Sequence, residues 1–197
     1  MNDIHESKGI DIFIKSIAME KRVFQNPKIK DKVTLLKSPQ ETNNEYILLE
    51  VELEAKGGNG IHYHTSFTEE FIPVDGALGI QIQQQQLRLL PGQRSTAPVN
   101  IPHRFYNPGH KPITFHVKIT PAQEGFLQGL KIAYGLAEDG LTNKNGVPKK
   151  LDHLAVLLEL SDTRVTGFLG FITPYLLWKA KKARKKGIHK ELIDKYC

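Results

Sequence analysis

The chain has 197 residues, of which 40% are hydrophobic and 24% are charged, as is typical of a folded single-domain protein. Its only cysteine is the last residue, Cys197, which excludes an internal disulfide framework and a cysteine-based metal cluster. The net charge of +6 resides in residues 179–197, so the rest of the chain gives no reason to expect nucleic-acid binding. No apolar run reaches the ~20 residues of a membrane span, and the first ten residues do not resemble a secretory signal. We therefore expect a cytoplasmic protein.

The first 44 residues give mixed signals. Apolar residues in 11–19 are spaced in a way that fits either a helix or a strand. Residues 28–36 predict a strand with one charged face. We expect residues 1–44 to be a leader that completes the main domain or contributes to an interface.

Strand patterns follow between residues 45 and 121. Short apolar runs, several with strict alternation of apolar and polar residues, are separated by turns rich in Gly, Pro and Asn. The glutamines of 83–86 fit a solvated hairpin tip. This pattern predicts an all-β barrel or sandwich. The expected strands are 46–54, 70–74, 78–82, 87–90 and 113–120.

Helical spacing begins after Pro121, so residues 122–197 predict a helical C-terminal extension. We expect helices over 123–136, 151–160 and 165–186. Ser161 or Asp162 is the expected N-cap of the third helix.

Two histidines and a glutamate carry the chemical signal. His62 and His64 are two residues apart, so on a strand both side chains point to the same face. Glu69 follows five residues later, beyond a small turn, and His103 follows a proline-rich turn 39 residues after His64. Imidazoles and a carboxylate that converge on one face are a minimal site for a divalent metal with open coordination positions.

These residues lie in two motifs that resemble those of the cupin superfamily. The first motif is matched by His62-x-His64, four residues, Glu69, six residues and Gly76, with the opening glycine off by one. The second motif is matched by Gly92, Pro98, His103 and Asn107, with Asn100 at the place of its inner glycine. Asn100 can adopt the left-handed conformation that a turn requires.

The resemblance implies a fold and a cofactor. The fold is the cupin jelly-roll barrel over residues 45–121, with C-terminal α-helices added. By resemblance His62, His64, Glu69 and His103 would bind one divalent ion such as Fe, Mn, Ni or Zn. Such a site could activate dioxygen, as in cupin dioxygenases, or polarise a carbonyl, as in cupin isomerases and decarboxylases. The resemblance also favours a homodimer, and it assigns no catalytic residue.

Two function hypotheses stay open. The first is a metal-dependent enzyme acting on a small molecule inside the barrel, and the second is a non-catalytic cupin that binds or senses a small molecule. The segment 165–178 is apolar apart from Thr and Gly, and a basic cluster, 179–186, follows it. This segment could pack on the barrel or on a second subunit, or contact a membrane surface.

Overall fold

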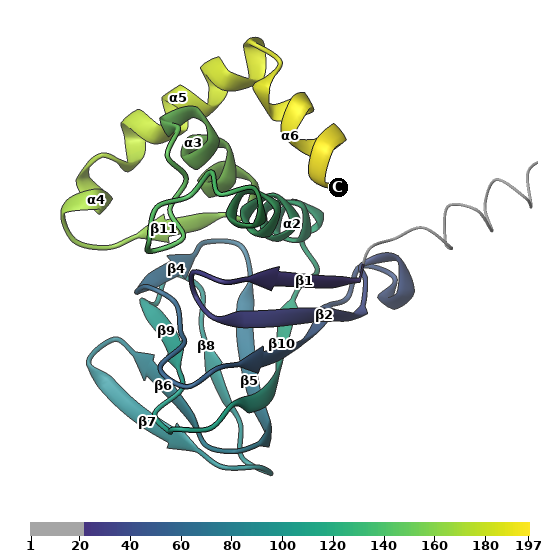
Figure 1. Cartoon of the computed structure of the whole chain (residues 1–197), viewed down its shortest axis with the longest axis vertical. Coiled ribbons are helices and arrows are strands. Elements are labelled where there is room, and N and C mark those ends of the chain that lie inside the picture. The colour runs from purple at the N-terminus through teal and green to yellow at the C-terminus, as the bar shows by residue number, and fades with distance from the viewer. Residues whose placement is uncertain (1–21) are drawn as a thin grey trace, which may run out of the picture.

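Two antiparallel sheets stacked face to face form the lower half of the molecule, and helices cover one end of them (Figure 1). The computed structural model describes residues 22–197. The predicted segment 11–19 lies outside the described residues.

The first sheet has six strands in the order β1-β2-β3-β10-β5-β8. Buried and half-buried positions alternate along its longer strands, because successive side chains of a strand point to opposite faces. The leader contributes two of these strands, β1 and β2, which extend the sheet beyond β3. The strands are β1 (Val23–Asn26), β2 (Asp31–Lys37), β3 (Ile47–Leu53), β5 (Thr68–Asp75), β8 (Ser95–Ala97) and β10 (Ile113–Thr120).

The second sheet has five strands in the order β11-β4-β9-β6-β7. Its strands are β4 (His62–His64), β6 (Leu78–Ile82), β7 (Gln85–Leu89), β9 (His103–Tyr106) and β11 (Thr163–Val165). The turn between β6 and β7 falls within the expected hairpin tip, although Gln85 and Gln86 already belong to β7. The sheet order and the double-layered barrel confirm the predicted jelly roll with added helices.

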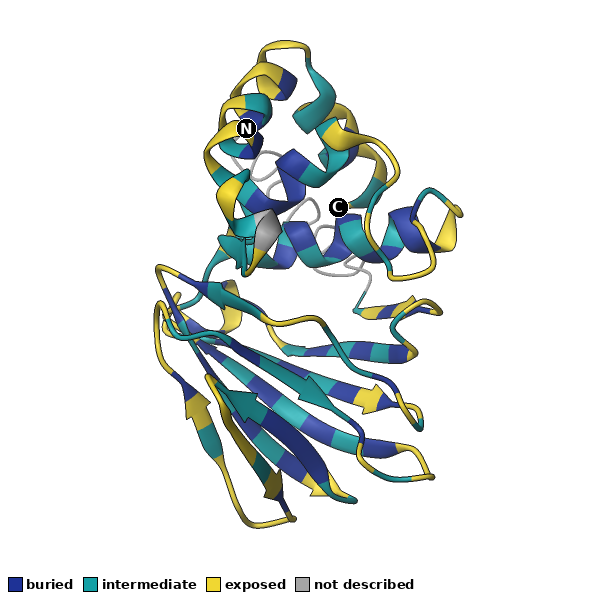
Figure 2. Ribbon diagram, turned by 90° about the vertical axis from the view of Figure 1, so that its left-hand side faces the viewer, coloured by how far each residue is buried: buried dark blue, intermediate teal, exposed yellow. Residues whose placement is uncertain are grey.

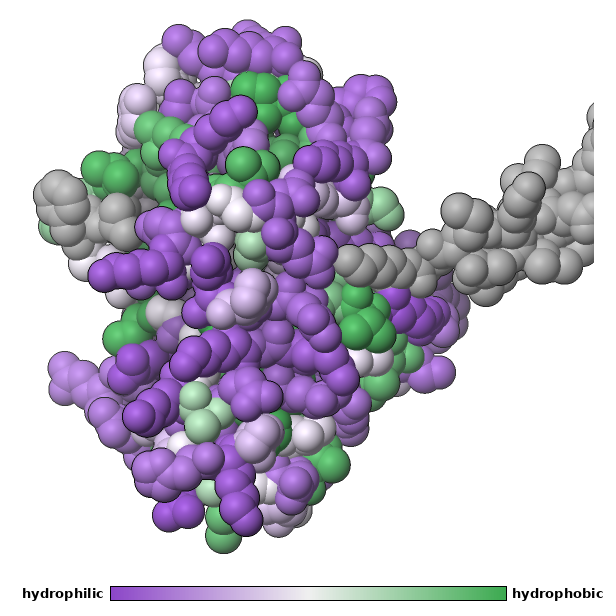
Figure 3. All heavy atoms as spheres, in the orientation of Figure 1, coloured by the Kyte–Doolittle hydropathy of each residue, from purple (hydrophilic) through white to green (hydrophobic). Residues whose placement is uncertain are grey.

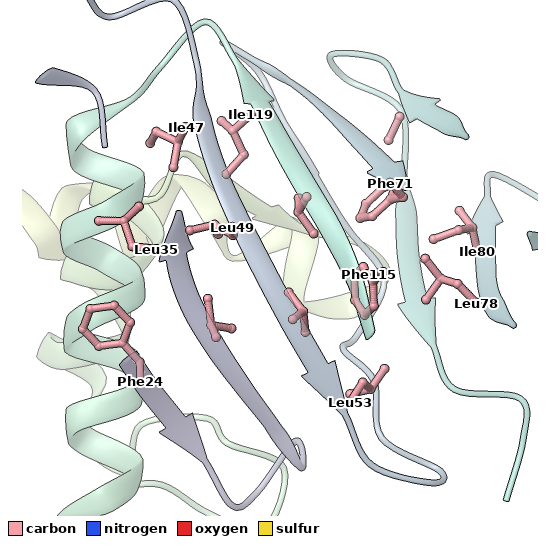
Figure 4. Close-up of a cluster of buried hydrophobic side chains, with 14 of the residues drawn as sticks. Phe24, Leu35, Ile47, Leu49, Leu53, Phe71, Leu78, Ile80, Phe115 and Ile119 are labelled. Atoms are coloured by element: carbon pink, nitrogen blue, oxygen red, sulfur yellow. The ribbon is translucent and has the colours of Figure 1, made fainter. Parts of the chain in front are cut away.

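The main core fills the space between the sheets. Apolar side chains from both sheets, among them Phe71, Phe115 and Leu78, meet there and are fully buried (Figure 4). This burial supplies most of the driving force for folding, since apolar area removed from water stabilises by roughly 25 cal/mol per Å².

The helices form a layer with a core of its own. Buried and exposed stretches alternate along these helices (Figure 2), and the buried apolar residues pack against one another or against the barrel core. Ile132, Leu136, Val156, Ala183 and Leu192 make the second core. Leu127 and Tyr134 of the first long helix belong instead to the barrel core, so this helix joins the two layers. The helices are the 3₁₀ turn η1 (Gln40–Thr42), α2 (Glu124–Glu138), α3 (Leu151–Leu160), α4 (Phe168–Phe171), α5 (Thr173–Lys185) and α6 (Ile188–Tyr196).

The prediction of a single helix over 165–186 is wrong. Its start is a strand, β11, and the helical part is divided into α4 and α5. Pro174 lies in the first turn of α5, where its missing N–H costs no hydrogen bond, so it starts a new helix. The boundaries given above for leader, barrel and extension stay a prediction. Within residues 22–197, no helix is both long and apolar enough to cross a bilayer.

Candidate metal site

The four residues of the two motifs converge between the sheets. His62 and His64 lie on β4 and His103 begins β9, where it is paired with His62 across the strands. Glu69 lies on β5, in the other sheet. One ligand atom from each of the four residues lies within 4.8 Å of the others. Among the described residues the structure thus brings together all four predicted ligands.

Backbone carbonyls fix the orientation of the three imidazoles. Nδ1 of His62 is 2.8 Å from the Gly60 carbonyl oxygen, and Nδ1 of His103 is 2.8 Å from that of Ile101. Nδ1 of His64 is 3.3 Å from the carbonyl oxygen of Asp162. A carbonyl can only accept, so each Nδ1 carries the hydrogen. Each ring is therefore held in the orientation that metal-binding histidines adopt, with Nε2 left for the ligand role.

The electrostatics of the cluster favour neutral imidazoles at His62 and His64, and a charged pair of Glu69 and His103. Burial lowers the pKa of His62 to about 4 and also lowers the pKa of His64. Burial alone would raise the pKa of Glu69, but the His103 hydrogen bond and the neighbouring histidines lower it to about 2. For His103 burial opposes charging, yet the Glu69 contact outweighs it and the pKa is raised. Without an ion, Glu69 and His103 form a buried pair, with His103 Nε2 2.8 Å from Glu69 Oε2.

One atom of the cluster shows that the residues fit a metal. Nε2 of His64 is buried and, within the described part of the chain, has no hydrogen-bond partner. It lies 3.8 Å from Glu69 Oε2, beyond hydrogen-bonding distance. A buried polar atom without a partner is costly, and coordination to an ion would satisfy it. Three nitrogens and one carboxylate suit several divalent ions, so the cluster could hold a metal without selecting its identity.

The helical extension contacts the strand that carries two of the candidate ligands and the turn that follows it. Strand β11 pairs with β4, the strand that carries His62 and His64. Just before β11, the Asp162 carboxylate accepts hydrogen bonds from the Thr65 backbone N–H at 2.8 Å and from the Ser66 hydroxyl at 2.7 Å. Because its carbonyl oxygen also binds His64, Asp162 ties the ligand strand to the extension.

Asp162 is a residue beside the candidate site that sequence reasoning missed. Ser161 or Asp162 is the expected cap of a helix, but the φ of Asp162, 48°, lies in the left-handed region and a strand follows it. No local pattern could reveal its role, since its partner His64 is 98 residues away.

Two departures from the cupin motifs have structural explanations. Gly57, the displaced opening glycine, packs so closely that an added Cβ would lie 2.6 Å from Leu53 Cδ1 and 2.9 Å from the carbonyl oxygen of residue 54. Asn100 has φ 62°, as expected for its place in the turn, and its N–H donates to the His64 carbonyl oxygen at 2.7 Å. Both motifs therefore keep the backbone geometry that places the ligands.

The cluster opens into a cavity of about 340 Å³. This volume is within the range of small-molecule sites, about 300–1,000 Å³. Side chains of the barrel, of α2 and of α3 line it, and most of them are apolar. Phe105, two residues after His103 on β9, is among them. His116 lies outside, with Nε2 3.3 Å from Glu50 Oε2.

Comparisons with known proteins give structural matches only. No family model matches the sequence, and comparison with curated proteins gives no match. KdgF from a Halomonas species matches with a TM-score of 0.46 and 15% identity, over 51% of this chain and 87% of that one. An RmlC-like cupin from Shewanella frigidimarina matches with a TM-score of 0.46 and 16% identity, over 54% and 89%. A sugar phosphate isomerase of the cupin superfamily from Silicibacter pomeroyi matches with a TM-score of 0.44 and 22% identity, over 53% and 73%.

Proposed function

We propose that this chain, whose barrel has the cupin fold, is a metal-dependent enzyme that acts on a small molecule in the cavity. The reaction is dioxygenase-like or isomerase- or decarboxylase-like. His62, His64, Glu69 and His103 bind one divalent ion, whose chemistry when bound is Lewis acidity or, for a redox-active ion, activation of dioxygen.

The observation that carries this proposal is the buried, unpartnered Nε2 of His64 in the four-residue cluster. Packing alone does not account for it, because an apolar residue would fill the same space without an unsatisfied nitrogen. His62 and His64 also line the cavity, so an open position at the ion would face a bound molecule.

Aromatic residues next to the cluster hold the His64 ring in place and exclude water from it. Phe67 is buried and stacks on the His64 ring with the ring centres 4.2 Å apart. Phe126 of α2 meets the same ring edge-on at 6.0 Å. These contacts fix the His64 ring and surround the site with apolar surface, which strengthens electrostatic interactions inside it.

The decisive experiment is metal analysis of the purified protein by mass spectrometry beside the double variant His62→Ala/His103→Ala. We expect near-stoichiometric metal in the wild type and none in the variant. His116→Ala is the matched control, since it removes a histidine of the barrel that lies outside the cavity. Wild-type protein that stays metal-free after incubation with Fe(II), Mn(II), Ni(II) and Zn(II) would refute the proposal.

The identity of the bound metal determines which turnover assay is used next. Iron directs the search to oxygen consumption, whereas manganese, nickel or zinc keeps decarboxylation and isomerisation alongside it. Metal binding together with saturable ligand binding and no turnover would instead support a non-catalytic binding or sensing protein.

A specific observation favours a second role, contact of the C-terminal helices with an anionic membrane surface. Phe171 at the end of α4 and Tyr175 and Trp178 of α5 are 85%, 49% and 50% exposed, and the last two contact each other on one face of α5. Apolar side chains gather near α4 and α5 at the upper left of Figure 3. Exposed lysines continue the same face, and Lys182 lies over the Trp178 ring, with Nζ 3.9 Å from its centre.

An aromatic face followed by lysines is typical of a helix that lies in the membrane interface. Sedimentation with vesicles tests this role. We expect binding to vesicles that contain phosphatidylserine, weak binding to phosphatidylcholine alone, and loss of binding in Trp178→Ser. A protein that stays in the supernatant with both kinds of vesicle would refute the membrane role. A dimer detected by light scattering and disrupted by Trp178→Ser would assign this surface to self-association.

A further inference from the structure

A carboxylate occupies a core position at the start of β2. Asp31, Val33 and Leu35 alternate along the strand and are all buried, Asp31 being 6% exposed. The Tyr134 hydroxyl of α2 donates a hydrogen bond to Asp31 Oδ2 at 2.6 Å. The other oxygen, Oδ1, is buried and has no partner among the residues that the structure describes. An unsatisfied carboxylate oxygen in the core is costly, so this position is not explained by packing.

Asp31 and Tyr134 line the same cavity as His62, His64 and Glu69. Asp31 belongs to the six-stranded sheet, whereas all three histidines belong to the five-stranded sheet. Most of the other residues that line the cavity are apolar, including Val33, Val51 and Leu130. The cavity is thus mainly apolar, with the candidate metal cluster and the Asp31 carboxylate as two separate polar sites on its lining.

The charge of the lining restricts what can bind. No lysine or arginine of residues 22–197 lines the cavity. A phosphate or a second carboxylate away from the metal would be buried without a counter-charge, and near Asp31 or Glu69 it would be repelled. The sugar phosphates named for one of the similar structures therefore do not suit this cavity.

Resting on the proposed function, we propose that the ligand is an uncharged, mainly apolar molecule with a polar group at each end. One end binds at the metal, and the other end, a hydroxyl or amide N–H, donates a hydrogen bond to Asp31 Oδ1. Tyr134 holds the carboxylate through Oδ2, so Asp31 is the residue that selects a donor at this end of the ligand.

The test uses three fluorescent probes of one shape. These are 2,6-dihydroxynaphthalene, its dimethyl ether, and the corresponding hydroxynaphthoate. The diol has a donor at both ends, the ether has a donor at neither end, and the naphthoate adds a charge. Dissociation constants are measured at pH 8 by fluorescence titration, for both zinc-loaded and metal-free protein.

We expect wild-type protein to bind the diol about tenfold more tightly than the ether, because a hydrogen bond to a charged group is worth at least this factor. The naphthoate should bind to the metal-free protein more weakly than the diol. In Asp31→Asn the Tyr134 hydroxyl takes the amide oxygen and leaves an NH₂ group facing the ligand. The preference for the diol should therefore disappear.

Glu52→Gln is the control, since Glu52 lies at the same end of the barrel but pairs with Lys32 outside the cavity. It should keep the wild-type preference. If Asp31→Asn does not fold, Asp31→Leu replaces it with a residue type that fits the strand alternation.

Equal affinity of wild-type protein for diol and ether would overturn the proposal. So would a preference that survives in Asp31→Asn, tightest binding of the naphthoate in metal-free protein, or no binding of any probe. Failure of the metal site is a separate result. It appears as zinc-free wild-type protein in metal analysis, while the donor preference is still measured without metal.

Discussion

The two walls of the cavity are built in different ways. The barrel wall carries the four candidate ligands on β4 and β9 of one sheet and β5 of the other, and His62 and His103 are oriented by carbonyls only two residues away, those of Gly60 and Ile101. The helical wall contributes mainly apolar side chains from α2 and α3, and its polar contacts reach across the chain, from Tyr134 to Asp31 and from Asp162 to His64. The barrel thus supplies the four-residue cluster and Asp31, and the helices close the cavity with mainly apolar side chains.

The largest expected effect tests whether the two walls unfold as one unit. Phe115→Ala in the barrel core should lower the free energy of unfolding by about 3–5 kcal/mol, and Ile132→Ala in the helical core by about 2–5 kcal/mol. Because α2 belongs to both cores, we expect a single transition in urea for the wild type and both variants, followed by circular dichroism and tryptophan fluorescence. The only tryptophan, Trp178, lies in the helical layer. Two separate transitions would show that the walls are independent.

The next effect concerns the ionisation of Asp31, a residue of the barrel whose carboxylate contacts Tyr134 of the helical layer. Burial raises the pKa of its carboxyl from 3.8 to about 7, against the Tyr134 hydrogen bond. The folded state therefore holds the proton more tightly than the unfolded state. The carboxyl's contribution to stability is fully present below pH 3.8 and is lost as pH rises to about 7.

Asp31→Asn, which cannot ionise, should thus gain stability relative to wild type over this range, by at most about 4 kcal/mol. Asp31 also lines a second, separate pocket, and the charged residues around it there are Lys30, Lys32, Glu52, Glu54 and Glu138. Tyr134 itself stays protonated, because burial raises its pKa well above 10.0. Urea titrations at several pH values measure the difference. A difference that does not change with pH would mean that the Asp31 carboxyl is not buried as described.

A smaller effect tests whether the extension supports the metal cluster. Asp162→Ala removes the hydrogen bonds to Thr65 and Ser66 and loosens the turn whose carbonyl orients His64. Loss of such outer support costs about 10–100-fold in metal affinity. We expect this decrease for Zn²⁺ in competition with a chelating dye, without loss of the fold. Unchanged affinity would show that β4 holds His64 without the extension.

The smallest effect concerns the surface of the helical layer. Arg184 of α5 contacts Glu159 of α3 at 2.9 Å, but its side chain is largely exposed. Solvent and salt screen such pairs, so Arg184→Ala should lower the free energy of unfolding by less than about 1 kcal/mol. It should leave zinc affinity unchanged. A decrease in affinity like that of Asp162→Ala would show that the whole helical layer, rather than one turn, positions the site.

Features that depend on neighbouring residues could be predicted from the sequence, whereas contacts between residues far apart in the chain could not. The convergence of His62, His64, Glu69 and His103 could be predicted because these residues stand at the spacings of two short motifs. The left-handed conformation of Asn100 could be predicted because turn conformation depends on a few neighbouring residues. The boundaries of the helix at Leu151–Leu160 followed in the same way from its apolar spacing.

Contacts between distant segments gave no such pattern. Asp162 lies 98 residues from His64, and Tyr134 lies 103 residues from Asp31. Residues 163–165 form a strand by pairing with β4, a partner that the local sequence does not reveal, and the apolar spacing from residue 165 onward predicted the start of a helix there instead. Pairing partners and buried polar pairs of this kind become visible only when the chain is folded.

Strand β11 also has a consequence for solubility. With β11 in place, β4 is paired on both sides, by β11 and by β9. Without β11, β4 would present a free row of N–H and C=O groups to other molecules, and such open edges are templates for aggregation. The opposite edge of the same sheet is β7, which exposes Gln85, Gln86 and Arg88, polar residues that discourage sheet-to-sheet association. Three residues of the extension thus keep the edge that carries His62 and His64 closed to intermolecular pairing.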